Sequence, residues 1–332
     1  MKSIMKNKIK EKFPFFMPLY QSWANPLRRI FNIIHNPQIL VLMYHRISDE
    51  EMDPYTTIVN LDKFESQIKF LKHNYNIIRL TDDWQNINEK SIVITFDDGY
   101  VDNYTNAFPI LEKYKAPATI FVATGNINTN KEFWDNDFIR MLLYRNKKND
   151  FLNLNEKKIF LKNDDDIKNA IYIIHDILNE LSPLQRDIVL KNIEQQLKPT
   201  KPYRENYRTL NDVELKLLDE SFSIDIGCHT VSHSRLATEN EKEQEYEIFH
   251  STQYLEKVLG HRIDSFAFPF GKKSDYNQTS IALLKKYNYK KAATTCSGQV
   301  HKIYNPYEIP RWAVGNWNLE DFKTRLDIFW KA

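Results

Sequence analysis

Short runs of β-branched and other apolar residues alternate along this chain with stretches whose apolar residues recur every three to four positions. The runs predict buried strands, and the longer period predicts amphipathic helices. We expect strands over 38–45, 76–80, 91–96, 118–124, 224–229, 266–271, 292–295 and 308–314, and helices over 61–74, 102–114, 210–220, 239–259 and 281–287. Buried strands that alternate with helices are typical of a parallel sheet or barrel, so the pattern favours an α/β fold of seven or eight βα units.

Residues 126–208 interrupt this alternation. They are rich in Lys, Asn, Asp and Leu, and their periodicity predicts helices over 133–144, 167–181 and 183–197. We interpret them as a helical insertion in one large domain that spans residues 37–315 and is followed by a C-terminal helix within 316–332. No motif in the insertion indicates a chemistry.

The first 36 residues differ in composition from the rest. They hold seven basic residues and one acidic residue, whereas the 332-residue chain carries a net charge of only +2. Pro14 and Pro18 interrupt their apolar run and no small-residue cleavage site follows, so we expect no signal peptide. Two interpretations stay open for this basic amphipathic segment: contact with an anionic membrane surface, or packing as an arm on the domain.

Charge and cysteine content narrow the class of protein further. The near-neutral net charge argues against nucleic acid as the main partner. Cys228 and Cys296 are the only cysteines, which indicates no disulfide framework. No stretch reaches 18 consecutive apolar residues, so we expect no transmembrane helix. We therefore expect a cytoplasmic protein, with peripheral contact at the inner face of the membrane as the alternative that the first 36 residues leave open.

Two adjacent carboxylates follow the strand predicted over 91–96. They are Asp97 and Asp98, and Gly99 then lets the backbone turn away. Adjacent buried carboxylates repel each other unless a cation lies close to both. An Asp-Asp-Gly sequence also has a simpler interpretation, a polar turn at a strand end.

A histidine pair far downstream favours the chemical interpretation. His229-Thr230-Val231-Ser232-His233 follows the strand predicted over 224–229, and a helical turn would place both imidazoles on one face. Two imidazoles and one carboxylate are a usual ligand set for Zn²⁺ or a similar divalent ion. The carboxyl ends of strands in a barrel are also where functional residues gather.

The motifs Thr95-Phe96-Asp97-Asp98-Gly99 and His229-Thr230-Val231-Ser232-His233 resemble the first two motifs of the polysaccharide deacetylases, the family with the NodB homology domain. Phe268-Pro269-Phe270-Gly271 is similar to the third motif of this family. The Leu-Met-Tyr-His-Arg-Ile segment near residue 44 and Ile309-Pro310-Arg311-Trp312 also resemble it. The resemblance covers roughly residues 38–315 apart from the insertion, and it implies a distorted (β/α) barrel of about seven strands.

The resemblance also implies a function, that of a metal-dependent hydrolase that removes N-acetyl groups from an amino-sugar glycan. It makes Asp98, His229 and His233 the ligands of a divalent metal ion, with Zn²⁺ first and Co²⁺ or Ni²⁺ as alternatives. It makes Asp97 the general base for the water that attacks the acetyl carbonyl, and the backbone N–H of Phe270 a donor to the oxyanion. Together with the expected location, it favours a lipid-linked or nucleotide-linked precursor of an envelope polysaccharide as the substrate.

Two positions depart from the family pattern. Ala267 stands where many members have an arginine that orients the catalytic aspartate, so Arg311 is our candidate for that role. No clear Leu-x-x-His motif supplies a general acid near the C-terminus, so His45 is our first candidate and His301 our second. Tyr100 is a candidate for stacking against the substrate. The alternatives are a salt bridge for Arg311, a structural histidine for His45 and core packing for Tyr100.

Two other functions stay open. A non-catalytic glycan-binding protein with the same fold is favoured by the missing arginine and the missing acid motif, and it is opposed by the presence of all four metal and base residues. A hydrolase of another amide or ester on the same barrel is the second alternative.

Overall fold

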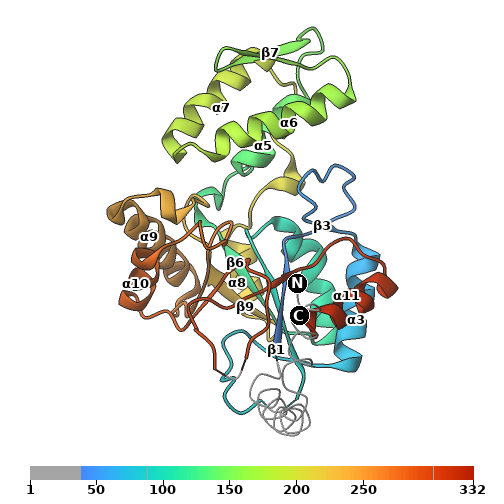
Figure 1. The fold of residues 1–332 in the computed structure, drawn as a ribbon, viewed down its shortest axis with the longest axis vertical. Helices are drawn as coiled ribbons and strands as arrows, with labels where there is room; N and C mark the ends of the chain where they lie inside the picture. The colour runs from blue at the N-terminus through green and yellow to red at the C-terminus, as the bar shows by residue number, and fades with distance from the viewer. Residues whose placement is uncertain (1–38, 88, 302) are drawn as a thin grey trace, which may run out of the picture.

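The computed structural model describes residues 39–87, 89–301 and 303–332. The predictions for the first 36 residues therefore lie outside the described residues. Figure 1 shows two parts: a barrel lobe around a central sheet, and a helical lobe that stands above it. No helix in the described residues is long and apolar enough to cross a membrane.

The central sheet in the described part of the chain has eight strands, and all of them pair in parallel. They are β1 (Ile39–Tyr44), β4 (Asn76–Ile77), β5 (Ser91–Phe96), β6 (Ala118–Val122), β9 (Ile224–Cys228), β10 (Ser265–Ala267), β11 (Lys291–Ala293) and β12 (Trp312–Ala313). Their order is β11-β10-β9-β6-β5-β1-β12, and β4 lies beside β5. Parallel pairing brings the carboxyl ends of all these strands to one edge of the sheet.

The last strand segment brings the two ends of the sheet together. β12 pairs with β1, while Ile309, just before it, bridges to Ala293 of β11. The backbone N–H of Arg311 also donates a hydrogen bond to the carbonyl of Cys296, beyond β11. The sheet is thus curled into a distorted barrel, which confirms the predicted fold class.

Helices cover the outside of the barrel. They are α3 (Leu61–Asn74), α4 (Phe108–Tyr114), α8 (Asp212–Asp219), α9 (Glu241–Leu259), α10 (Gln278–Lys286) and α11 (Leu319–Phe329). Figure 1 shows α9 and α10 on one flank and α3 and α11 on the other. Shorter elements complete the lobe: the paired strands β2 (Arg46–Ile47) and β3 (Ile58–Val59), a π-helical turn over Asn103–Ala107, and 3₁₀ turns over Thr124–Asn126, Glu205–Tyr207 and Leu236–Thr238.

Asparagine is the N-cap residue of five of the described helices, which accounts for part of the high Asn content. In each case its side chain accepts a hydrogen bond from the backbone N–H three residues later. These residues are Asn163, Asn211, Asn240, Asn277 and Asn318. Such a cap contributes about 1 kcal/mol, because it satisfies a backbone donor that the helix itself leaves unpaired.

Side chains along each strand alternate between two core layers. Leu40 and Leu42 of β1 pack outward under the helices, whereas Val41 faces the barrel interior with Phe121 of β6. Gly227 makes room for that ring, because a Cβ there would lie 2.5 Å from it. The same alternation carried along β5 places Asp97 on the interior side at the top of the barrel.

The helical lobe has a hydrophobic core of its own within residues 134–197. It contains α5 (Trp134–Leu143), the antiparallel strands β7 (Phe151–Leu154) and β8 (Lys157–Phe160), α6 (Asp164–Asn179) and α7 (Pro183–Leu197). The β7–β8 hairpin was not predicted. Its tight turn places Asn155 and Glu156 at φ of 50° and 63°, and a glutamate in such a turn is not a typical hairpin signal.

Candidate metal centre and active site

Three of the predicted residues meet above the carboxyl ends of β5 and β9. Asp98 is the second residue after β5, and His229 and His233 lie in the loop after β9. Asp98 Oδ1 lies 3.4 Å from His229 Nε2 and 3.2 Å from His233 Nε2. One ligand atom from each residue falls within 4.8 Å of the others. The spacing suits a single cation between them.

The helical spacing argument for the two histidines was wrong. Residues 229–233 form a loop in which Thr230 has a φ of 69°, a left-handed conformation that is rare for a β-branched residue. The Glu247 carboxylate fixes this loop, because it accepts hydrogen bonds from the backbone N–H groups of Val231 and Ser232, both at 2.8 Å. The imidazoles meet because the backbone turns back on itself.

The donor set fits a divalent cation. His229 Nδ1 lies 2.8 Å from the carbonyl oxygen of Ala267, which fixes that nitrogen as the protonated one and leaves Nε2 free to act as a ligand. Asp98 Oδ1 is buried and has no hydrogen-bond partner among the described residues. A buried carboxylate oxygen beside two imidazole nitrogens is satisfied by a bound cation. Ala267, where the family pattern has an arginine, thus contributes through its backbone.

The charges of Asp98 and His233 shift each other's pKa. Burial by itself raises the pKa of Asp98, but the nearby histidines, His233 foremost, together outweigh burial and bring this pKa well below its usual value. Burial conversely lowers the pKa of His233, but the surrounding carboxylates, Asp98 foremost, together outweigh burial and raise this pKa. Both directions follow from opposite charges held close together at a buried site.

Asp97 is held by Arg311, which is fully buried. Arg311 Nη1 lies 2.6 Å from Asp97 Oδ1 and Nη2 lies 2.7 Å from Oδ2, a bidentate pair. Arg311 also donates to Thr95 Oγ1 and to the carbonyl of Thr294, at 3.1 and 2.8 Å. Burial would raise the pKa of Asp97, but the charge and hydrogen bonds of Arg311, together with the nearby histidines, outweigh burial and lower this pKa. Arg311, just before β12, therefore contacts Asp97, which the short side chain of Ala267 cannot do.

Phe270 lies in the tight turn after β10, with a φ of 60°. Among the described residues, no group accepts a hydrogen bond from its backbone N–H, so this donor is available to a ligand. Its ring packs against the His233 imidazole, with 5.0 Å between ring centroids. Gly271 completes the turn, because a Cβ there would lie 2.7 Å from the backbone nitrogen of Thr295.

The two histidines considered as general acids lie at opposite ends of β1. His45 directly follows the strand, is half-buried, and is close enough for its charge to help lower the pKa of both Asp97 and Asp98. His301 is adjacent to Val300, which pairs with Ile39 at the start of β1. His301 is therefore at the wrong end of the barrel for the chemistry, and His45 remains the candidate.

Tyr100 does not line an open cleft. It is buried, and its hydroxyl accepts a hydrogen bond of 2.8 Å from Asn136 Nδ2 of α5. Its ring meets Phe133 edge-on, with centroids 5.2 Å apart. Tyr100 thus connects the Asp-Asp-Gly turn to the helical lobe, and the packing alternative describes it better than contact with a substrate.

Sequence reasoning missed three residues beside the site. Glu247 fixes the histidine loop from the middle of a charged helix. Arg235 lies 3.1 Å from Asp275, contacts the ring of Phe270 and donates to Asn179 of α6, so it joins the site to the helical lobe. Asp135, in the first turn of α5, has its pKa raised by burial and feels the charges of the metal cluster. None of them belongs to a local motif, so no sequence signal marked them.

Comparison with known proteins agrees with this arrangement. The profile of the family described as polysaccharide deacetylase matches residues 85–146 and 190–292. The chain is 36% identical over 108 residues to a poly-beta-1,6-N-acetyl-D-glucosamine N-deacetylase of Staphylococcus aureus, a match that covers 26% of this chain and 37% of that protein. Matches to the curated relatives thus span about a third of their length.

Solved structures share the fold along most of the chain. The Streptococcus pyogenes deacetylase PplD, determined in complex with acetate, superposes with a TM-score of 0.55 at 22% identity and covers 87% of this chain and 98% of its own. IcaB from Ammonifex degensii gives a TM-score of 0.58 at 16% identity, with 90% and 99% covered. The fold and the motif residues define a NodB-type barrel. The chain belongs to the polysaccharide deacetylase family.

Proposed function

We propose that this chain is a metal-dependent N-deacetylase that hydrolyses the acetamido group of an amino-sugar glycan to acetate and a free amine. The main support is that two groups lie at the same edge of the sheet: the cluster of Asp98, His229 and His233, and the buried ion pair of Asp97 with Arg311. The name of the Staphylococcus aureus relative makes N-acetylglucosamine oligomers the first substrates to test.

The proposed roles follow from the contacts. Asp98, His229 and His233 would hold the cation, with Zn²⁺ as the first candidate and Co²⁺ or Ni²⁺ as alternatives. When bound, such an ion lowers the pKa of a water to near 7. Asp97 accepts the proton of the nucleophilic water. Arg311 makes Asp97 a weaker base but keeps it ionised and fixed in position. The N–H of Phe270 donates to the oxyanion that develops at the acetyl oxygen.

We further propose that His45 protonates the departing amine. His45→Gln should lower kcat strongly on an N-acetylated sugar, because an amine leaves poorly without a proton. The same variant should lose little on 4-nitrophenyl acetate, whose leaving group needs no proton. Equal losses on both substrates would instead give His45 a structural role.

The first experiment is elemental analysis combined with an acetate-release assay. Wild type should hold close to one equivalent of metal, and Asp98→Ala and His229→Ala should lose both metal and activity. His261→Ala, half-exposed at the outer surface beside Asp219, serves as the control that keeps both. A folded wild type that takes up no metal after loading contradicts the proposal.

The same assay separates the alternatives. A protein that binds metal and glycan but releases no acetate is a binding protein on this fold. Release of a different acyl product defines a hydrolase of another class. The finer substrate expectation, an amino sugar linked to a lipid or nucleotide, needs the assay repeated on both carriers. Because residues 1–36 lie outside the described residues, membrane contact and the cytoplasmic location stay predictions, which vesicle co-sedimentation and cell fractionation test.

A further inference from the structure

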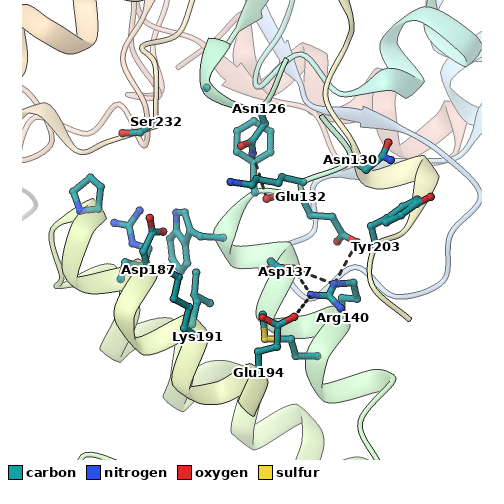
Figure 2. Close-up of a pocket in the computed structure, with 18 of the residues that line it drawn as sticks. Asn126, Asn130, Glu132, Asp137, Arg140, Asp187, Lys191, Glu194, Tyr203 and Ser232 are labelled. Carbon is teal, nitrogen blue, oxygen red and sulfur yellow. Dashed lines mark hydrogen bonds and ion pairs between the residues drawn. The ribbon is translucent and has the colours of Figure 1, made fainter. Parts of the chain in front are cut away.

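A cavity of about 690 Å³ lies between the two lobes. Figure 2 shows Asp187, Lys191 and Glu194 along α7 on one side, and Tyr203 on the opposite side. Ser232, from the histidine loop of the barrel lobe, closes one end. The volume lies within the range of roughly 300–1,000 Å³ that is typical of small-molecule sites.

The cavity is a neighbour of the candidate metal centre and not part of it. None of the three proposed metal ligands lines it. Val231 and Ser232 do, and they connect His229 to His233 in the chain. Phe133 forms the partition, because it lines the cavity and its ring centroid lies 5.7 Å from that of His233. Phe133 therefore lies between the cavity and one of the proposed metal ligands.

The charges around the cavity balance. Four cationic and four anionic side chains line it, and several are already paired with each other or with neighbours. Arg140 lies 2.7 Å from Asp137, and Glu132 pairs with Arg204 through several buried hydrogen bonds. A phosphate or nucleotide requires an excess of positive charge, so a balanced lining favours a neutral ligand.

The lining also contains two buried side chains that carry N–H donors, Trp134 and Arg186. Trp134 Nε1 is buried and has no acceptor among the described residues. Arg186, also buried, donates to the carbonyls of Leu178 and Leu181 and makes no ion pair with a described carboxylate. Its guanidinium lies 4.4 Å from the centroid of the Trp134 ring. Hydroxyl groups of a neutral ligand are suitable acceptors for such donors.

Tyr203 adds an aromatic surface to these donors. Its ring is half-buried on the wall opposite α7. A partly exposed aromatic face together with fixed polar donors suits a sugar ring, which presents apolar C–H faces and polar hydroxyls.

We propose that this interlobe cavity binds a sugar residue of the glycan chain, next to the residue whose N-acetyl group lies at Asp98, His229 and His233, with Tyr203 as its stacking surface. The proposal rests on the proposed function and narrows it, because it makes the protein act on oligomers in preference to single sugars. Part of the cavity wall, including Arg186 and Asp187, comes from residues that the family profile does not match.

The test compares N-acetylglucosamine oligomers of one to six residues. Tyr203→Ala should raise KM for long oligomers by about three- to tenfold, the loss of one stacking contact, and leave the monosaccharide unchanged. Lys191→Trp should have the same length-dependent effect by filling the cavity from α7. Tyr246→Ala, which removes a 54% exposed ring on α9 outside the cavity, is the matched control. Thermal unfolding of each variant checks that the fold is intact.

Binding to protein stripped of metal with EDTA, where no turnover occurs, separates this inference from the proposed function. Length-dependent binding that both cavity variants weaken supports the subsite even if wild type releases no acetate, an outcome in which only the proposed function fails. If wild type releases acetate but neither variant changes KM or binding for oligomers of any length, the subsite is overturned and the proposed deacetylase function stands. Binding that neither length nor the variants change, with no acetate released, overturns both.

Discussion

The barrel lobe and the helical lobe reach the same site by different physical means. In the barrel lobe, Asp97 and Arg311 form a fully buried ion pair at the end of a continuous strand core. The helical lobe packs around its own hydrophobic core and approaches the site through few contacts, among them the hydrogen bond from Asn136 to Tyr100. The family profile skips residues 147–189, which contain the β7–β8 hairpin and α6. The barrel thus supplies the residues of the candidate metal site and the buried ion pair, whereas the helical lobe supplies much of the wall of the neighbouring cavity.

The sharpest test of this division is Asp97→Asn. Loss of the base should reduce kcat for acetate release by about 10²–10⁴-fold. Asp135→Asn, which changes a carboxylate of the helical lobe near the same site, should change KM more than kcat. Steady-state kinetics on one oligomer measures both. A larger fall in kcat for the Asp135 variant would instead assign a chemical role to the helical lobe.

Arg311→Met should be the most destabilising substitution at the site. It leaves the Asp97 carboxylate buried and unpaired, which costs about 3–5 kcal/mol of unfolding free energy. Arg208→Met is the matched control, because its ion pair with Glu214 is partly exposed and should contribute about 1 kcal/mol or less. Urea unfolding with metal absent gives both values. A near-equal loss would show that the buried pair is not the anchor of the barrel edge.

Ile174→Ala tests whether the helical lobe unfolds on its own. Ile174 is fully buried in that lobe, and its truncation should cost about 2–5 kcal/mol. We expect amide hydrogen exchange to accelerate within residues 134–197 and to stay slow in the barrel strands. Leu42→Ala, in the barrel core, should show the opposite pattern. Faster exchange throughout both lobes in each variant would mean that they unfold as one unit.

Lys291→Met addresses the barrel end opposite the site. Lys291 Nζ donates to the carbonyls of Leu80 and Asp82, and burial lowers its pKa to about 8. An unfolded lysine has a pKa of about 10.4, so between these values the unfolded state binds the extra proton and stability rises with pH. Deprotonation of Lys291 alone should raise the free energy of unfolding by about 2 kcal/mol between pH 7.5 and 9.5. Urea unfolding at both pH values should show a smaller rise of the unfolding free energy in the variant than in wild type. An equal rise in both contradicts the assignment of this pH dependence to Lys291.

The barrel could be predicted from the sequence because its strands are unbroken apolar runs, and the helix over 61–74 and the strand over 91–96 match the structure residue for residue. The metal cluster could be predicted because its residues lie in short motifs. The left-handed backbone at Thr230 could not be predicted, because a β-branched residue such as threonine does not favour that conformation. Glu247 and Asp135 reach the site only through tertiary packing, and the β7–β8 hairpin depends on an unusual turn.

The backbone of the site loops has a consequence for how this protein could change. Asp98, Thr230, His233 and Phe270 all have φ between 54° and 75°, a region where each non-glycine residue costs on the order of 1–3 kcal/mol. Thr230→Gly would relieve part of that cost and should make the protein more heat-resistant. The same freedom would let the histidine loop adopt other shapes and weaken its grip on a cation. Selection for thermal stability alone would therefore favour substitutions that weaken cation binding. Heat resistance favours a relaxed backbone in this short loop, whereas cation binding requires the strained one.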